Sequence, residues 1–119
     1  MIPMQFRLKS HEEFQSVVKQ KQVVKNQSFV LYYALSEKKV LQVGISVSKK
    51  LGCAVKRNRI KRQVRHMAHE LLDEREPIAV AIIVRSRYQT EDFAKMKEDL
   101  DQVLRILRRK INEKMEKMD

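Results

Sequence analysis

Residues 49–67 read KKLGCAVKRNRIKRQVRHM, a stretch with eight Lys or Arg side chains and no Asp or Glu. Gly52 breaks the preceding strand-like segment, and from residue 53 to about residue 73 apolar side chains recur at helical spacing. The apolar stripe consists of Cys53, Ile60, Val64, Met67 and Leu71. The stretch therefore predicts a long helix with a narrow apolar side and a broad cationic side.

This helix lies between two segments that are typical of strands. Residues 41–48 (LQVGISVS) alternate between an apolar core face and a face that carries only Gly44, Ser46 and Ser48. Those small groups leave room for something to lie against them. Residues 78–84 (IAVAIIV) form a continuous apolar run, which predicts a strand buried on both faces. Because a long helix joins the two strands, we expect them to be parallel neighbours.

The remaining segments complete a mixed fold. Residues 11 to about 20 predict a short helix with Ser10 at its N-cap. Residues 28–35 predict a strand, preceded by a short extra strand in VVKN (23–26), and a last helix carries an apolar stripe over residues 93–111. The order of helix, two or three strands, helix, strand and helix predicts an α+β sandwich with helices packed on one face of a single sheet.

Bulk properties limit the class of protein. A length of 119 residues and a hydrophobic content of 43% predict one domain, over residues 1–119, with an ample core. The formal net charge of +11 favours polyanionic partners. A single cysteine excludes an internal disulfide and a multi-cysteine zinc site. We find no membrane span and no signal-peptide core, so we expect a cytoplasmic protein.

A helical wheel shows how the charge is arranged. Arg57, Lys61 and Arg65 form an i, i+4, i+8 ladder of like charges, which destabilises a helix where a mixed ladder would stabilise it. The rest of the cationic side is filled by Asn58, Arg59, Arg62 and His66. Phosphate binding explains the pattern better than a merely solvated face, because the guanidinium fork donates two parallel hydrogen bonds.

Two other readings of a basic helix fit less well. A DNA recognition helix belongs to a helix-turn-helix or to a coiled-coil dimer, and neither pattern surrounds this one. A membrane-surface helix needs Trp, Phe or Leu beside its basic side, and residues 53–69 contain no aromatic. The sequence therefore favours RNA, and neither DNA nor a membrane.

The small-residue strand face is a second candidate for RNA contact. Single-stranded RNA is commonly held on a sheet by stacking on aromatic side chains. Phe14 on the first helix and Tyr32 or Tyr33 on the strand are candidates, although Phe14 fits an ordinary core position equally well. Asn26, Ser46 and Ser48 could line the same groove.

The chain offers little for catalysis. Its histidines have no metal-ligand spacing, and His66 and His69 fit the basic side of the helix better than a site. Cys53 falls on the apolar stripe, so we expect a buried, inert thiol, although a helix N-terminus can activate one. We therefore predict no catalytic residue and no metal site on the protein itself.

The segment LGCAVKRNRIKRQVR (51–65) is similar to the signature of the bacterial ribonuclease P protein family, in which Gly-x-Ala-Val leads into an Arg-Asn-Arg helix. VGISVSKK (43–50) resembles the strand and Lys-Lys pair before that signature. Arg7-Leu8, Phe14 and FVLYY (29–33) match the start of the family in order and spacing. The resemblance covers about residues 7 to 87.

The resemblance implies an αβββαβα sandwich around a central sheet, with a left-handed crossover where the ordinary rule predicts a right-handed one. It also implies a holoenzyme in which a large RNA, using RNA-bound Mg²⁺, removes the 5′ leader of precursor tRNA while the protein assists. No cofactor is then expected on the protein.

Residue roles are carried over by position. Contacts to the catalytic RNA are expected from Lys49, Lys50, Lys56, Arg57, Asn58, Arg59, Lys61, Arg62 and Arg65. The leader is expected in a cleft lined by Phe14, Val18, Asn26, Tyr32, Ser46 and Ser48.

Three positions depart from the family pattern. Val18 stands where a second aromatic is frequent, which weakens the expected stacking on the first helix. Lys21 stands where a Gly commonly follows that helix, which bears on the geometry of the turn. Cys53 occupies a position that is often polar in the family.

Two other classes of function stay open at this point. One is a structural RNA-binding protein of the ribosome or another ribonucleoprotein, which ribosomal RNA as stoichiometric partner would identify. The other is a metal-dependent nuclease acting alone, which would need convergent carboxylates. The acids of this chain lie on helix starts and linkers instead.

Overall fold

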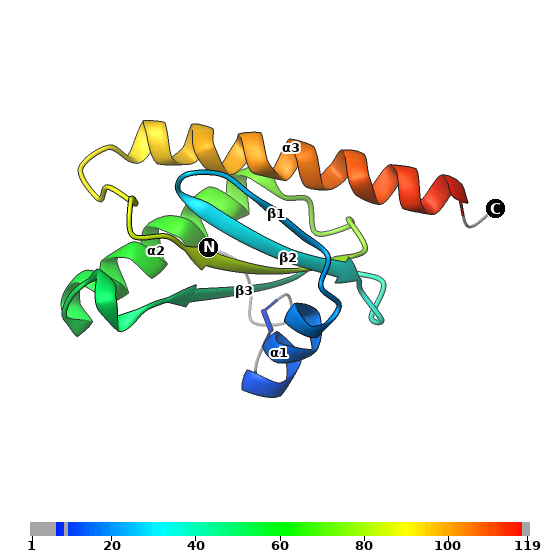
Figure 1. The fold of residues 1–119 in the computed structure, drawn as a ribbon, viewed down its shortest axis with the longest axis horizontal. Coiled ribbons are helices and arrows are strands. Elements are labelled where there is room, and N and C mark those ends of the chain that lie inside the picture. The colour runs from blue at the N-terminus through cyan, green and yellow to red at the C-terminus, as the bar shows by residue number, and fades with distance from the viewer. Residues whose placement is uncertain (1–6, 9, 118–119) are drawn as a thin grey trace.

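The computed structural model describes residues 7, 8 and 10–117. Three helices, a short 3-10 turn and four strands follow one another along the chain, and Figure 1 shows them in space. In chain order they are α1 (His11–Lys19), β1 (Val23–Lys25), β2 (Phe29–Leu35), β3 (Gln42–Val47), η2 (Lys49–Leu51), α2 (Ala54–Leu71), β4 (Ile78–Val84) and α3 (Phe93–Lys117). This confirms the predicted order αβββαβα, including the short extra strand.

The four strands form one sheet in the order β1-β2-β4-β3. β1 pairs with β2 and β2 with β4 in antiparallel fashion, whereas β3 and β4 are parallel. The predicted parallel pair joined by the long helix is therefore confirmed. The left-handed sense of that crossover stays a prediction.

Helices cover both faces of the sheet. α2 and α3 bury the larger core on one face, where Ile60, Val64 and Leu104 are fully buried. α1 lies on the other face (Figure 1), and its Val17 packs on Ala79 and Ala81 of β4. The expectation of helices on one face only was wrong, because the small β4 side chains admit a short helix on the second face. β4 is consequently buried on both sides, as predicted.

The ends of α1 are set by two residues. The Ser10 hydroxyl accepts a hydrogen bond from the Glu13 amide (3.1 Å), which confirms the predicted N-cap. Lys21 ends the helix with a left-handed backbone (φ 59°), and its amide donates to the Val18 carbonyl (3.1 Å). The turn thus keeps the conformation that a glycine would adopt, although the residue is a lysine.

Polar contacts fasten α2 and the β1–β2 turn to α3. Glu70 at the end of α2 accepts from Lys97 and pairs with His66 at 2.9 Å. Two residues further along α3, buried Asp99 accepts a hydrogen bond from the Ser28 hydroxyl. The second contact fixes the turn that leads into β2.

Candidate nucleic-acid interface

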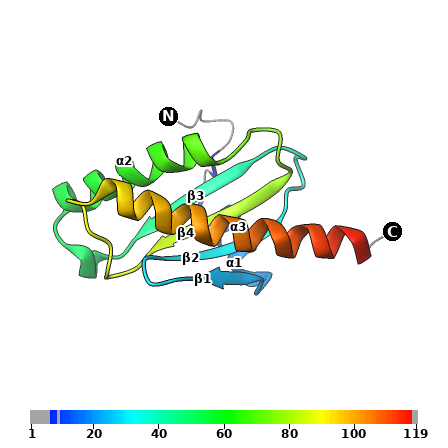
Figure 2. The same cartoon turned by 90° about the horizontal axis from the view of Figure 1, so that it is seen from above.

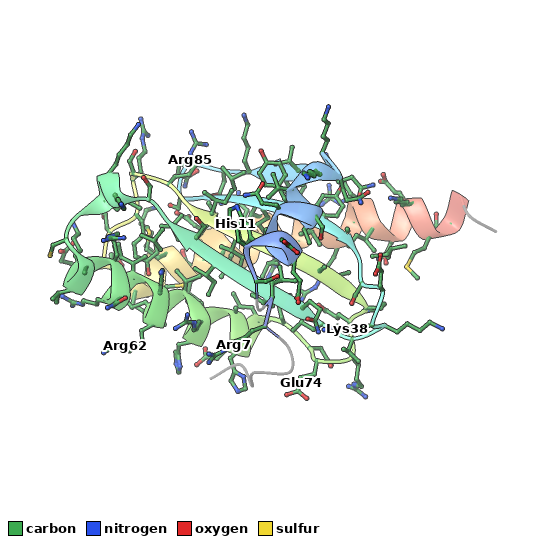
Figure 3. The ribbon with its side chains drawn as sticks, turned by 90° about the horizontal axis from the view of Figure 1, so that it is seen from below. Arg7, His11, Lys38, Arg62, Glu74 and Arg85 are labelled. Carbon is green, nitrogen blue, oxygen red and sulfur yellow. The ribbon has the colours of Figure 1, made fainter. Side chains whose placement is uncertain are left out.

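The cationic side of α2 faces solvent, as its periodicity predicts. Ile60, Val64 and Met67 are fully buried against the sheet. The nine residues of the basic face, as we call the expected RNA contacts, are at least partly exposed: Lys49, Lys50, Lys56, Arg57, Asn58, Arg59, Lys61, Arg62 and Arg65. Figure 3 shows Arg62 pointing outward from α2. α2 therefore has a buried apolar stripe on one side and a continuous polar surface on the other.

The charge of the basic face is not neutralised within the protein. In the part of the chain that the structure describes, none of its eight cations forms an ion pair with a carboxylate. The guanidinium of Arg57 donates to the Gly52 carbonyl (3.2 Å), and the other groups keep their donors for solvent or a partner. This leaves a surface with a strong attraction for phosphate.

Arg7 adds to the basic face from outside α2. Arg7 forms a parallel bridge with Val43, and the Leu8 amide donates to the Val43 carbonyl at 2.9 Å. Figure 3 shows Arg7 beside α2. Burial, followed by the charge of Arg7, lowers the pKa of Arg65, which indicates how close the two cations lie. No sequence pattern assigns Arg7 a role, because only the pairing with β3 brings it there.

The prediction of a buried Cys53 was wrong. Its side chain is exposed, not buried, because Cys53 is the N-cap of α2 and has an extended backbone (φ −69°, ψ 171°). The helical wheel therefore does not apply to it. The backbone amides of Lys56 and Val55, which point towards the N-terminus of α2, lower the pKa of the thiol.

The second candidate surface is the sheet face that carries α1. On β2 the side chains alternate, so Tyr32 lies on this face and Tyr33 is buried on the other. Phe14 and Val18 of α1 pack with Tyr32 around the small cluster of Val17, Ala79 and Ala81. Of the two candidate tyrosines, Tyr32 is therefore the one on the sheet face that carries α1.

Phe14 fits against the sheet because of Gly44. A Cβ atom at Gly44 would lie only 2.7 Å from Phe14 Cδ2 and 3.0 Å from Leu8 Cδ1. The ring is partly buried, so the two readings of Phe14 are compatible. One side of the ring packs on the sheet, and part of it stays accessible.

Beside α1, one row of the sheet stays uncovered. Val30 pairs with Ile83, and Ile83 with Ser46, so the three side chains share one face. All three are partly exposed, and none belongs to the cluster beneath α1. We call this row, with Phe14 and Tyr32 at its border, the open face.

Two of the expected cleft residues lie apart from this row. Ser48 is exposed and accepts from the Lys50 amide (3.2 Å), so it links the end of β3 to the basic face. Asn26 lies in the β1–β2 turn. Its side-chain nitrogen donates to the Asp99 carbonyl on α3 (2.7 Å), and its oxygen accepts from the Phe29 amide (3.0 Å). Its amide is directed to the α3 side and away from the open face.

Two cations that no sequence pattern singles out border the open face. Lys25 of β1 pairs with Val30 and is exposed at the edge of the same row. Arg85, which directly follows β4, donates to the Asn26 carbonyl (2.9 Å). Figure 3 shows Arg85 across the sheet from α2. The open face therefore has cations on both sides.

A separate hollow of about 380 Å³ lies on the other flank of α1. Its lining includes Glu13, Gln20 and Lys38, and none of the expected cleft residues.

Residues 7, 8 and 10–117 contain no group of three or more His, Cys, Asp or Glu side chains that could hold a metal ion. Within the same residues, every helix is too short or too polar to cross a membrane.

Comparison with known proteins agrees with this geometry. Residues 2–108 match the family model for ribonuclease P. The chain is 38% identical over 101 residues to a ribonuclease P protein component of Streptococcus equi subsp. zooepidemicus, which is 85% of each protein.

Two solved structures have a similar fold. One is the RNase P protein of Staphylococcus aureus, with a TM-score of 0.74 and 32% identity over 86% of this chain and 94% of that one. The other is the RNase P protein of Thermotoga maritima, with a TM-score of 0.70 and 25% identity over 87% and 96%. These findings leave the ribosomal alternative without support. The chain belongs to the ribonuclease P protein family, the protein components of the ribonuclease that processes the 5′ end of tRNA.

Proposed function

We propose that this protein binds the catalytic RNA of ribonuclease P through the basic face and holds the 5′ leader of precursor tRNA on the open face. The observation that carries the proposal is the basic face itself: eight cations without an ion pair in the described part of the chain, on and just before one helix. A polyanion bound there would relieve the repulsion along α2 and release counterions.

The open face supports the second half of the proposal. It combines two aromatic rings, Phe14 and Tyr32, with small or aliphatic side chains and with cations at both borders. Base stacking on aromatics stabilises single strands by about 1–3 kcal/mol per base and accepts any base. Such a face suits leaders of varied sequence. Val18 in place of a second aromatic leaves fewer stacking positions on α1.

The proposed division of labour follows from the side chains available. The RNA would carry the hydrolytic chemistry with Mg²⁺ held by its own phosphates. The protein would lower the Mg²⁺ requirement by supplying fixed positive charge and by holding the leader. This assigns the protein to the cytoplasm, where tRNA precursors are made in bacteria.

A cleavage assay tests the proposal. Precursor tRNA is incubated at low Mg²⁺ with a bacterial ribonuclease P RNA, with and without the protein. We expect strong stimulation by the protein and no cleavage by the protein alone. Absence of stimulation would refute the proposal, and cleavage without RNA would show that the chemistry lies on the protein. Ribosomal RNA as the stoichiometric co-purifying partner would identify a different function.

A further inference from the structure

The turn after α1 contains an unfavourable residue choice. Lys21 has a left-handed backbone (φ 59°), which is strained for any residue with a Cβ atom and unstrained for glycine. The conformation is fixed by the end of α1, where the Gln20 amide donates to Val17 and the Lys21 amide to Val18. Lys39 in the β2–β3 turn has the same backbone conformation, so it is the position of the Lys21 side chain, and not the strain alone, that points to a role.

Four more lysines lie along the same edge of the sheet. Lys19 ends α1, and Lys25 ends the edge strand β1. On α3 the Lys114 ammonium lies against the Gln22 side chain, and Lys110 lies one turn earlier on the same helix face. We call Lys19, Lys21, Lys25, Lys110 and Lys114 the lysine edge. Figure 2 shows β1 at the border of the sheet opposite α2.

The lysine edge gathers several cations whose charge is not neutralised by a neighbouring carboxylate. All five side chains are exposed, and none forms an ion pair with any residue that the structure describes. Three other cations of α3 are paired: Lys97 with Glu70, Arg105 with Asp101 and Arg108 with Glu76. The lysine edge is therefore a second concentration of unneutralised charge, separated from the basic face by the width of the sheet.

The open face leads from one of these charged surfaces to the other. Its row runs from Ser46 on β3, through Ile83 and Val30, to Lys25 at the β1 edge. A single strand that crosses this row away from α2 arrives at the lysine edge. Lysine suits such a segment, because its compact charge on a flexible stem follows a phosphate backbone without fixing its orientation.

We propose that the lysine edge binds the phosphates of the leader upstream of the nucleotides that lie on the open face. This rests on the proposed function, because it assumes a leader on the open face. It adds a second contact region, which only long leaders reach. Binding there depends on charge and salt and not on base identity.

The test uses the reconstituted holoenzyme and three substrates: mature tRNA and precursors with leaders of about 3 and about 10 nucleotides. The quantity measured is the gain in affinity from the short to the long leader. We expect a clear gain for the wild type. Lys21→Gly, and separately Lys19→Gln with Lys114→Gln, should each reduce that gain about twofold to fivefold and lower the salt slope by about 0.7 per lost contact.

Lys21→Gly should at the same time stabilise the protein, with a Tm about 2–4 °C higher, because it relieves the left-handed strain. Lys39→Gly is the matched control. Lys39 is exposed, has the same backbone conformation (φ 60°) and lies in the β2–β3 turn, outside the lysine edge. The Tm of the Lys39→Gly variant should rise similarly, while its gain in affinity from the short to the long leader stays unchanged.

Several outcomes would overturn the proposal. An unchanged long-leader gain in both lysine variants excludes the contact, and so does a wild type that gains nothing from a longer leader. A Tm that does not rise in Lys21→Gly removes the strain argument. A wild type that binds the short-leader precursor no better than mature tRNA would refute leader binding on the open face, which is failure of the proposed function itself.

Discussion

Replacing Gly44 by alanine should displace the Phe14 ring from the open face. The added methyl carbon would lie 2.7 Å from Phe14 Cδ2 and 3.0 Å from Leu8 Cδ1. Carbon atoms normally approach to about 3.5–4.0 Å, so the ring has to move by about 1 Å. Leu8 is held through its backbone bond to Val43, whereas the Phe14 side chain is partly exposed and can swing outward.

The expected magnitudes differ for stability and for leader binding. Overpacking costs about 1–3 kcal/mol in a closed core. Because the Phe14 ring can yield towards solvent, we expect about 1 kcal/mol of destabilisation. A base that stacks on Phe14 would contribute about 1–3 kcal/mol, and a displaced ring loses most of it. The leader-bearing substrate should therefore bind about tenfold more weakly, since 1.4 kcal/mol corresponds to a factor of ten.

The assay is a double-mutant cycle of Gly44→Ala and Phe14→Ala. Dissociation constants of precursor and mature tRNA are measured with the holoenzyme for all four combinations, and thermal unfolding monitors stability. Once the Phe14 ring is removed, only the contacts of the methyl group with Leu8 remain and there is no ring to displace, so Gly44→Ala should have little further effect on leader binding. Additive losses would refute the reasoning. So would an equal loss for mature tRNA, which would indicate a general folding defect.

Three further predictions concern other parts of the protein. Arg57→Ala combined with Arg59→Ala should weaken RNA assembly and reduce its log–log salt slope by about 1.4–1.8, as measured by binding over a salt series. Asn26→Ala removes bonds in the β1–β2 turn and to α3, so denaturant unfolding should show a loss of about 2–3 kcal/mol without loss of leader discrimination. The bond from Lys97 lowers the pKa of Glu70 below its ordinary value of 4.5. The Tm advantage of the wild type over Glu70→Gln should therefore be complete above that pH and disappear as the pH falls further.

Each of these predictions has a control or a contrary outcome. The control is Arg105→Ala, which removes a cation that is already paired with Asp101 outside the basic face. The salt slope of this variant should not change. An unchanged slope for the Arg57 and Arg59 variant would count against phosphate contact. Loss of leader discrimination in Asn26→Ala would place that side chain on the open face. A Tm difference for Glu70→Gln that is independent of pH would show that the carboxylate charge does not matter.

Periodicity predicts those parts of the molecule where burial follows the backbone repeat. The stripe of Ile60, Val64 and Met67 is buried as the helical repeat predicts, and the alternation around Gly44 describes the two faces of β3. Cys53 marks the limit of this reasoning. The residue precedes the first helical turn, so the angular position assigned to it by the wheel has no physical meaning.

The misplaced and missed residues depend on contacts between distant parts of the chain. Asn26 looks like a groove residue in the sequence, but its partner on α3 lies 73 positions further on. Arg7, Lys25 and Arg85 reach the interface only because β1, β2, β4 and β3 lie in that order. No local pattern contains this information, whereas the resemblance of the α2 segment already implies the family.

The double use of α2 has a consequence for the amount of protein in the cell. α2 connects β3 to β4 and also carries the unneutralised charge. The repulsion between its cations therefore lowers the stability of the whole fold. An RNA partner present at about a hundred times its dissociation constant would stabilise the native state by about 2.7 kcal/mol. Protein made in excess of RNA would lack that stabilisation and unfold more often. Such protein would therefore be cleaved by proteases more readily than protein assembled with its RNA.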